Sequence, residues 1–487
     1  MLWIPEVRKT RQGTTFSPYA SIAPLTSPDF DFAPLLVASS SQEPADGDLP
    51  DHEHNTNEPD EADDFMNEVD DTYPPPLPPD PWNEVDDVPE RPTPPPPKRR
   101  RTAVDDMLDG KKPLTHSHRN RKSKRAKLFA EKGNVARLST LNTHARAALA
   151  TPLRQTLDAQ TLPVAYGAYG AKVENAAESK GRTKARTLEE LVRIGFEVVH
   201  WNGFDARPLV DARGRIFAVL AGQPRDAGWA SAVERAYRDI SAEGTAASFP
   251  AKMHHHRRGL FAAVNVGLSY GKGQRIPSRL LNPRYDPMLD RLLKNPDIDR
   301  MATFASAAFS LWAPRLYQYY WDHKEALLQH LPHLRLNFPR SVFSCAAFNF
   351  GPNVWTFRHR DGQNVPFGWC AIQAAGPFDP TKGGHLVLWN LRLAVEFPPG
   401  ALILVPSATV AHSNVPVQEG DCRISFTQYT AGGLMRYVDN GFRTEGELAA
   451  EDPEEFKRMA ALKELRWEMG LGLLSTVDEL LERKPDE

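Results

Sequence analysis

Short runs that mix apolar with polar residues dominate the chain from about residue 340 to residue 438. Such runs, rich in Val, Ile, Phe and Tyr, are typical of β-strands. Glycine and proline stand between them, where turns require these residues. The pattern predicts strands at residues 342–349, 356–359, 369–374, 385–388, 394–397, 401–405, 410–415 and 423–429. We therefore expect a β-rich core and assign residues 336–440 to it.

The segment before this core mixes helical and strand patterns. Leucines at helical spacing, and long amphipathic runs later on, favour helices. The last of these runs must break at Pro314, because proline cannot donate the backbone hydrogen bond of a helix interior. The pattern predicts helices at residues 188–194, 229–242 and 297–331, a strand at 196–201 and a hairpin at 207–221 with its turn at 211–214. We expect residues 185–335 to form an α+β buttress of the core.

The segment after the core returns to a helical pattern. Lys and Glu interleave with apolar residues over residues 445–483, and Gly470 and Gly472 interrupt the run. Glycine weakens a helix interior, so we expect one break there. Residues 441–487 are accordingly predicted to be a C-terminal helical extension.

The first 150 residues have no such periodicity, and their charges are segregated. Residues 41–90 hold 18 Asp or Glu and no Lys or Arg, whereas residues 91–137 hold 15 Lys or Arg and four acids. Charge blocks repel internally and stay solvated, and the proline-rich stretch at 73–97 favours polyproline II. We expect residues 1–150 to be disordered. Basic clusters at 98–101, 111–112 and 119–127 favour nuclear import over phosphate binding or a charged tail without function.

Composition sets the remaining limits. The chain has 487 residues, 41% of them hydrophobic, which supports a core and two or three domains. Its apolar runs are too short for a membrane span, and its start lacks the pattern of a secretory signal. Three scattered cysteines give no disulfide framework. We expect a soluble protein in a reducing compartment, without a membrane partner.

The spacing of three residues suits a mononuclear iron site. His359 and Asp361 are two apart, so on a strand end their side chains point the same way, and His412 can supply the third ligand. Two imidazoles and one carboxylate hold Fe(II) on one face and leave positions open for a cosubstrate and dioxygen. His385 is the main rival to His412, although the spacing from His412 to Arg423 and Ser425 favours His412.

The separation in sequence between His412 and Arg423 is compatible with a cosubstrate that spans both residues. If Glu419 and Gly420 form a two-residue turn, Pro416 lies opposite Arg423 in a hairpin, and Arg423 lies four residues along the ladder from His412. Four strand residues span roughly 13 Å. A five-carbon dicarboxylate that chelates the metal at one end could fill that gap and meet the guanidinium with its far carboxylate.

Four pieces of sequence carry a resemblance to a known family. They are His256-Arg-Arg-Gly259 with Gly267-Leu-Ser-Tyr-Gly-Lys-Gly273, His359-Arg-Asp-Gly-Gln-Asn364, Gly383-Gly-His-Leu-Val-Leu388, and His412-Ser-Asn414 running into Arg423-Ile-Ser-Phe-Thr-Gln-Tyr429. The segment from about residue 256 to residue 443 resembles the fungal TET/JBP-like branch of the 2-oxoglutarate and Fe(II) dioxygenases.

The resemblance implies a fold, an activity and a set of site residues. The fold is an α+β double-stranded β-helix, of jelly-roll or cupin type, with flanking helices. The activity is oxidation of the 5-methylcytosine methyl group in DNA to hydroxymethyl and sometimes further, with Fe(II), 2-oxoglutarate and dioxygen. By position, His359, Asp361 and His412 hold iron, and Arg423, helped by Ser425, holds 2-oxoglutarate. Asn364 is expected in the pocket of the flipped base.

The chain departs from animal TET enzymes, which carry a cysteine-rich zinc module. Cys345, Cys370 and Cys422 cannot build such a module, so no structural zinc is expected and DNA contacts must come from elsewhere. Arg257 and Arg258, with Lys272 and Arg275, are candidates for contacts to phosphates. Aromatic residues near the ligands are candidates for stacking on an extruded base, although most are expected in the core. These residues are Trp355, Phe357, Trp369 and Tyr429.

Other functions remain open at this stage. The same metal site could act on methyladenine, on RNA or on a protein side chain, because the iron motif alone does not define the substrate. The chain could also be a nucleic-acid-binding relative with idle chemistry. The glycine-rich stretch at 267–273 lacks the Ser or Thr after its lysine that a nucleotide-hydrolysing loop needs.

Overall fold

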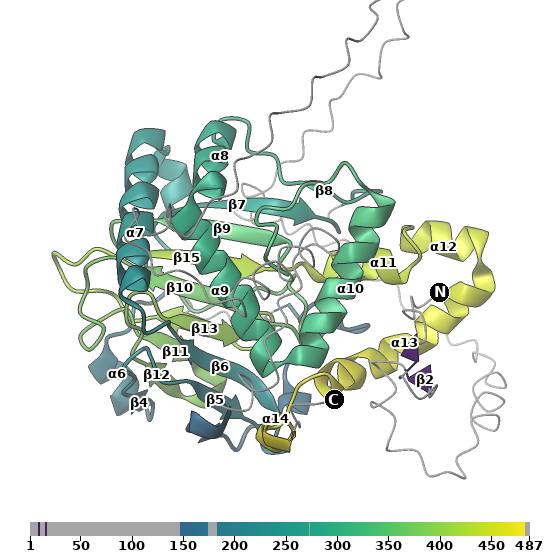
Figure 1. Ribbon diagram of the computed structural model, residues 1–487, viewed down its shortest axis with the longest axis horizontal. Helices are drawn as coiled ribbons and strands as arrows, with labels where there is room; N and C mark the ends of the chain where they lie inside the picture. Colours follow the sequence, from purple (N-terminus) through teal and green to yellow (C-terminus); the bar gives the residue numbers. More distant parts are fainter. Residues whose placement is uncertain (1–7, 10–14, 17–146, 174–182, 272, 483–487) are drawn as a thin grey trace, which may run out of the picture. The chain divides into compact units, whose positions relative to one another are not determined.

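The computed structural model describes residues 8–9, 15–16, 147–173, 183–271 and 273–482 (Figure 1). Two short strands, β1 (Arg8–Lys9) and β2 (Thr15–Phe16), pair with each other. Apart from these strands and residues 147–150, the predicted tail with its proline-rich and basic segments lies outside the described residues. Lys272 also lies outside them.

A nine-stranded sheet forms the larger half of the core. Its strand order is β3-β5-β6-β13-β10-β15-β9-β7-β8. Every neighbouring pair in it is antiparallel except β3 with β5. The strands are β3 (Leu153–Arg154), β5 (Arg207–Val210), β6 (Ile216–Gly222), β7 (Ala262–Ser269), β8 (Ser278–Arg279), β9 (Cys345–Phe350), β10 (Cys370–Ala375), β13 (Leu402–Val405) and β15 (Ile424–Tyr429).

A four-stranded sheet forms the other half, in the order β14-β11-β12-β4. Its strands are β4 (Glu197–Val199), β11 (Leu386–Leu388), β12 (Leu393–Val395) and β14 (His412–Asn414). Leu388 and Val395 of this sheet belong to the same buried cluster as Leu404 of the larger sheet. The two sheets therefore bury apolar faces in one core.

The chain crosses repeatedly between these two sheets. It runs through β9 and β10 in the larger sheet, β11 and β12 in the smaller, β13 in the larger, β14 in the smaller and β15 in the larger. Two packed, mainly antiparallel sheets connected in this way form a double-stranded β-helix of jelly-roll type. The predicted α+β fold with flanking helices is confirmed.

Helices cover the outer face of the larger sheet (Figure 1). These are α7 (Ala227–Ala247), α8 (Asp286–Lys294), α9 (Pro296–Trp312) and α10 (Pro314–His330). Side chains alternate along β15: Ile424 and Phe426 pack with α7, α8 and α9, whereas Ser425 and Thr427 line a cavity on the other face. A strand projects successive side chains to opposite faces, so β15 joins the helical layer to the cavity.

Most of the predicted elements before and after the core are present. The helix α6 (Leu188–Arg193), the strand β4, the β5–β6 hairpin and the break between α9 and α10 at Pro314 match the predictions. After the core come α11 (Gly432–Asp439), α12 (Glu445–Glu451), α13 (Pro453–Gly472) and α14 (Val477–Glu482). The predicted interruption falls at the end of α13, and a second break at Asp452 was not predicted.

Two predictions about the core were wrong. The turn at Glu419 and Gly420 exists, but the segments beside it do not pair: β14 pairs with β11, and β15 pairs with β9 and β10. The expected pairing of Pro416 with Arg423 is therefore absent. Residues 356–359 form no strand and only bridge Gly259 and His412. In addition, β7 was not predicted: Gly267 lies inside this strand with a φ of +127°, and glycine in a sequence usually marks a turn.

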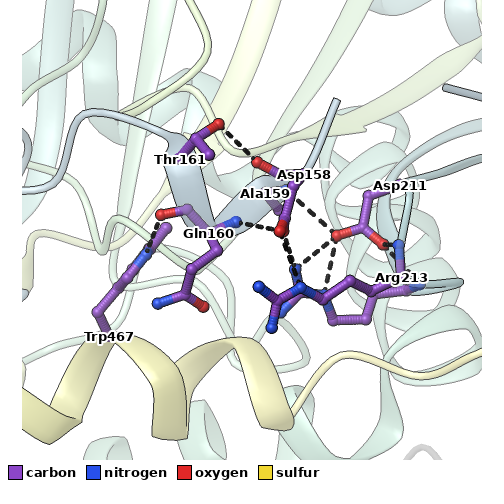
Figure 2. A network of polar contacts seen from close by, with 8 residues as sticks. Asp158, Ala159, Gln160, Thr161, Asp211, Arg213 and Trp467 are labelled. Atoms are coloured by element: carbon purple, nitrogen blue, oxygen red, sulfur yellow. Dashed lines mark hydrogen bonds and ion pairs between the residues drawn. The ribbon is translucent and has the colours of Figure 1, made fainter. Parts of the chain in front are cut away.

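A polar network ties the segment before β5 to the rest of the core (Figure 2). The Asp158 carboxylate accepts hydrogen bonds from Arg213 Nε at 2.8 Å and Arg215 Nη2 at 2.7 Å. Asp211 accepts from Arg215 and from the Ala159 backbone N–H. From the other side, Trp467 Nε1 of α13 donates to the Gln160 carbonyl at 3.1 Å. The network anchors the segment of residues 153–173 to the β5–β6 hairpin and to α13.

Candidate metal centre

Three side chains lie close together beside β14 of the smaller sheet. Among the described residues, they form the one cluster of metal-ligand type. They are His359, Asp361 and His412, whose ligand atoms all lie within 4.8 Å of one another. His359 Nε2 lies 3.8 Å from Asp361 Oδ1, and His412 Nε2 lies 3.9 Å from Asp361 Oδ2. The structure thus brings the three predicted ligands together.

Backbone pairing explains this convergence. The His359 N–H donates to the His412 carbonyl at 3.0 Å, and the His412 N–H donates back at 2.9 Å. Residues that exchange both bonds across an antiparallel bridge project their side chains to the same face. Asp361 follows two residues after His359 and is anchored by its own N–H to the Ser407 carbonyl at 2.9 Å. The bridge therefore places the two histidines side by side, and the hydrogen bond to Ser407 holds Asp361 beside them.

Each imidazole is held by its own chain. His359 Nδ1–H donates to the Phe357 carbonyl at 2.8 Å, and His412 Nδ1–H donates to the Val410 carbonyl at 3.0 Å. Such bonds to the second ring nitrogen select the tautomer and orientation of a ligating histidine. Both Nε2 atoms are left to face Asp361, with their lone pairs available to a metal.

The electrostatics of the site favour ligating forms. Burial, together with the neighbouring His412, holds the pKa of His359 well below its usual value, so the imidazole is neutral. Burial alone would raise the pKa of Asp361, but the facing histidines and Arg258 lower it to about 2. A neutral imidazole and an ionised carboxylate are the forms that bind a divalent metal. This donor set fits Fe(II), which two histidines and one carboxylate hold with positions left open.

A cavity of about 520 Å³ opens from the three ligands. One face of the β15 segment lines it, through Arg423, Ser425, Thr427 and Tyr429. These residues are two apart in sequence, so they project to the same side of the strand. The predicted 2-oxoglutarate residues and the predicted metal ligands therefore share one cavity, although His412 lies on β14 of the smaller sheet and Ser425 on β15 of the larger one.

Arg423 is a buried cation without an acidic partner among the described residues. Its side chain is 1% exposed, and Nη1 donates to the Val354 carbonyl at 2.7 Å. Nε is buried and has no hydrogen-bond partner in the described part of the chain. The rings of Phe378 and Phe397 lie 5.7 and 5.8 Å from its guanidinium carbon. Burial lowers the pKa of Arg423 to about 10, which leaves it charged at neutral pH.

An unpaired buried guanidinium is costly unless an anion meets it. A carboxylate matches its donors in geometry and charge. Ser425 lies two residues further along, and its hydroxyl accepts a hydrogen bond from Asn349 Nδ2 at 2.8 Å, which leaves its own proton free to donate. The donors that line the cavity therefore fit a dicarboxylate such as 2-oxoglutarate.

The predicted substrate residues lie at the same cavity. Asn364 lines it and donates from Nδ2 to Ser407 Oγ at 3.1 Å. Arg257 and Arg258 also line it, in a tight turn closed by hydrogen bonds between His256 and Gly259. Arg258 Nη2 is buried there and has no hydrogen-bond partner among the described residues.

Other candidates lie elsewhere or serve the fold. His385 is fully buried and does not line the cavity, so it is not a rival ligand in this arrangement. Trp369 is buried and donates to the Phe217 carbonyl. Trp355 and Phe357 pack edge to face, and neither lines the cavity. Arg275 pairs with Glu447.

Sequence reasoning missed several residues of the cavity. Lys172 and Val173 line it although they precede the ligands by more than 180 positions, and Arg360 links to that segment through a hydrogen bond from Nη2 to the Lys172 carbonyl at 3.4 Å. No local sequence pattern predicts such a contact. Asn349 could have been suspected, since a polar residue on a buried strand requires a partner.

Comparisons with known proteins define no family for the chain. No protein-family model matches it, and no curated protein matches it. Among solved structures, NgTET1 in complex with 5mC DNA has 12% identity and a TM-score of 0.35, over 49% of this chain and 84% of that one. A 2OG-Fe(II) oxygenase family oxidoreductase from Burkholderia pseudomallei has 14% identity and a TM-score of 0.25, over 48% and 95%. The collagen prolyl hydroxylase vCPH of Paramecium Bursaria Chlorella virus-1, in its 2OG complex, has 15% identity and a TM-score of 0.16, over 18% and 59%.

Proposed function

We propose that the chain is a dioxygenase dependent on Fe(II) and 2-oxoglutarate. The observation that carries this proposal is the meeting of His359, Asp361 and His412 with the unpaired buried Arg423 in one cavity. When bound, the iron would supply the oxidising power that removes hydrogen from an unactivated C–H bond, while 2-oxoglutarate and dioxygen become succinate and carbon dioxide and one oxygen atom enters the product.

The residues of the chain would bind and orient the reactants. The two histidines and Asp361 would hold the metal on one face. Arg423 would bind the far carboxylate of 2-oxoglutarate, and the Ser425 hydroxyl would donate a second hydrogen bond to it. Phe378 and Phe397 flank the guanidinium and exclude water from it, which strengthens the ionic contact.

We further propose that the substrate is 5-methylcytosine in DNA, oxidised to hydroxymethylcytosine and further. Support comes from the chemistry of the cavity. Lys172, Arg257, Arg258 and Arg360 give its lining a positive charge, which suits a polyanion. Asn364 offers an amide for the edge of a base, and Tyr429 offers an aromatic face on which an extruded base can stack.

Methyladenine, RNA and protein side chains remain alternative substrates for the same metal centre, and an idle nucleic-acid-binding protein is the alternative without chemistry. We would incubate the purified full-length protein with Fe(II), 2-oxoglutarate and 5-methylcytosine DNA, and quantify oxidised bases by mass spectrometry beside Asp361→Ala. Oxidised cytosine that the variant does not form supports the proposal. Succinate that depends on Asp361, without an oxidised base, redirects the substrate search, and neither product favours the idle binding protein.

A further inference from the structure

A second cavity, of about 290 Å³, adjoins the metal centre. Gly362 and Gln363, which directly follow the metal-ligand candidate Asp361, line both cavities. Two segments of similar composition form much of its wall: Tyr166-Gly-Ala-Tyr-Gly170, and Tyr270-Gly271 from the glycine-rich stretch at the end of β7. We call it the tyrosine–glycine cavity.

Two glycines at the start of α11 allow these segments to close on one another. A Cβ atom at Gly432 would lie 1.8 Å from the Tyr169 carbonyl oxygen, and one at Gly433 would lie 2.3 Å from the Tyr270 carbonyl oxygen. Real Cβ contacts are never so short, so only glycine permits both approaches. The Gly432 N–H also donates to the Gln363 carbonyl at 2.9 Å. The tyrosine segments, α11 and the loop after Asp361 are thus joined at one point.

The cavity presents an aromatic surface and an available cation. Tyr166 is 73% exposed. Of the three cations that line the cavity, Lys463 pairs with Glu445, and Arg466 Nη1 donates to the Gly167 carbonyl at 2.8 Å. The Arg436 side chain makes no hydrogen bond or ion pair within the described ranges, and its guanidinium carbon lies 6.0 Å from the Tyr270 ring centre.

Exposed aromatic rings beside arginine are what proteins use to bind single-stranded nucleic acid, because every base has a face that stacks and every linkage carries a negative charge. A cavity of this volume is at the small end of ligand sites and suits one base rather than a duplex. Gly362 and Gln363 line both cavities, so the tyrosine–glycine cavity lies directly beside the cavity of the metal centre.

We propose that the tyrosine–glycine cavity binds the nucleotide next to the one presented to the metal centre. Tyr166 stacks on its base, and Arg436 contacts its phosphate. This inference rests on the proposed nucleic-acid substrate and adds a prediction about it: the enzyme holds its target within a strand of at least two nucleotides, through contacts outside the reacting cavity.

The test is equilibrium binding, which needs no turnover. A fluorescein-labelled single-stranded trinucleotide with a central 5-methylcytosine is titrated with full-length protein and competed with 5-methyldeoxycytidine monophosphate. We expect Tyr166→Ala to weaken trinucleotide binding about tenfold, since the base loses the ring on which it stacks. Tyr166→Phe keeps the ring and should keep the affinity. Arg436→Gln should reduce the slope of log K against log salt by about 0.7, the value for one phosphate of a single strand.

The control is Arg238→Gln on α7, an arginine whose side chain is 62% exposed and which does not line either cavity. It should change neither affinity nor slope. Unchanged trinucleotide affinity in both Tyr166→Ala and Arg436→Gln, with binding still weakened by Arg258→Glu, would overturn the inference and leave the proposed function standing. If the unaltered protein binds no oligonucleotide, both the inference and the nucleic-acid substrate fail, whereas succinate formation still reports on the iron site.

Discussion

At the scale of single residues, the chemistry of this protein depends on polar atoms that the fold leaves available. His359 and His412 use one ring nitrogen each to hold their own backbone, which frees the other for a metal. Arg423 uses Nη1 on a carbonyl and keeps Nε without a partner among the described residues. The types and spacing of these residues were readable in the sequence, but the strand expected at residues 356–359 is absent, and His359 is placed by an isolated bridge to His412.

Replacing Arg423 should act on 2-oxoglutarate. We expect Arg423→Gln to raise KM for 2-oxoglutarate by about 10- to 100-fold, because hydrogen bonds to charged groups contribute roughly 1.5–3 kcal/mol. Arg423→Lys keeps the charge but loses the planar guanidinium, so its KM for 2-oxoglutarate should lie between the values of the unaltered protein and of Arg423→Gln. Steady-state succinate formation measures both, and an unchanged KM in Arg423→Gln would exclude this residue from the cosubstrate site.

Gly384 lies close to the Arg423 side chain, so a substitution at Gly384 is a second way to perturb the proposed contact between Arg423 and 2-oxoglutarate. Its φ is +73°, and an added Cβ would lie 3.0 Å from Phe378 Cε2 and 3.3 Å from Arg423 Cδ and Nε. Gly420 has a φ of +88° with nothing near an added Cβ, so Gly420→Ala is a matched control for backbone strain. We expect backbone strain to cost both alanine variants about 1 kcal/mol of stability, and the tight contacts to Phe378 and Arg423 to cost Gly384→Ala more and to raise its KM for 2-oxoglutarate. Equal KM values in the two variants would contradict a role for this approach.

At the scale of elements, local patterns predicted strands and turns but not their partners. The turn at Glu419 and Gly420 is local, since glycine there adopts a positive φ, and it was predicted correctly. The strands beside it separate into different sheets, because their apolar neighbours lie in β11 on one side and in β9 and β10 on the other. Arg423 therefore reaches the metal centre across the space between the sheets and not along one ladder.

Helices α10 and α11 are joined by a buried pair with a pH signature. His323 Nε2 donates to Asp439 Oδ1 at 2.9 Å. Burial opposes both charges, but the partners offset it: the pKa of His323 rises above 6.5 and that of Asp439 falls below 3.8. Stability from the raised histidine is complete below pH 6.5 and is lost as pH rises through its folded pKa. Stability from the depressed aspartate is present above pH 3.8 and is lost as pH falls further.

We therefore expect His323→Gln to destabilise the protein by about 3 kcal/mol near pH 5.5 and by clearly less near pH 8.5. Urea denaturation at the two pH values measures the difference. The exposed His333→Gln is the control and should change stability at neither pH. An equal loss at both pH values would show that His323 contributes packing and not charge.

At the scale of the whole molecule, residues outside the predicted core complete it. Strands β3, β5, β6, β7 and β8 extend the larger sheet, and β4 extends the smaller one. The proposed division at residue 335 therefore separates strands of a single sheet and stays a prediction. Residues 165–173 reach the metal centre through the hydrogen bond from the Ala171 N–H to the Gly362 carbonyl at 2.8 Å. None of the helices described is both long enough and apolar enough to cross a membrane.

The predicted tail gives a prediction at the same scale. We expect residues 1–150, fused to a fluorescent protein, to accumulate in nuclei, because the basic clusters at 98–101 and 119–127 resemble import signals. Replacing the Lys and Arg of both clusters by Gln should abolish accumulation, and replacing as many acids in residues 41–90 by Gln should not. Fluorescence microscopy measures the nuclear share, and uniform distribution of the unaltered fusion would refute the import role.

Residue types and local spacing were enough to predict which side chains could bind a metal and a keto acid, and most of the strands, helices and turns, because these properties depend on residues a few positions apart. Long-range contacts were needed to show which sheet each strand joins, how His359 comes to face His412, and which distant segment lines the cavity. Those outcomes depend on how apolar faces are buried over the whole chain, which a local sequence pattern cannot predict.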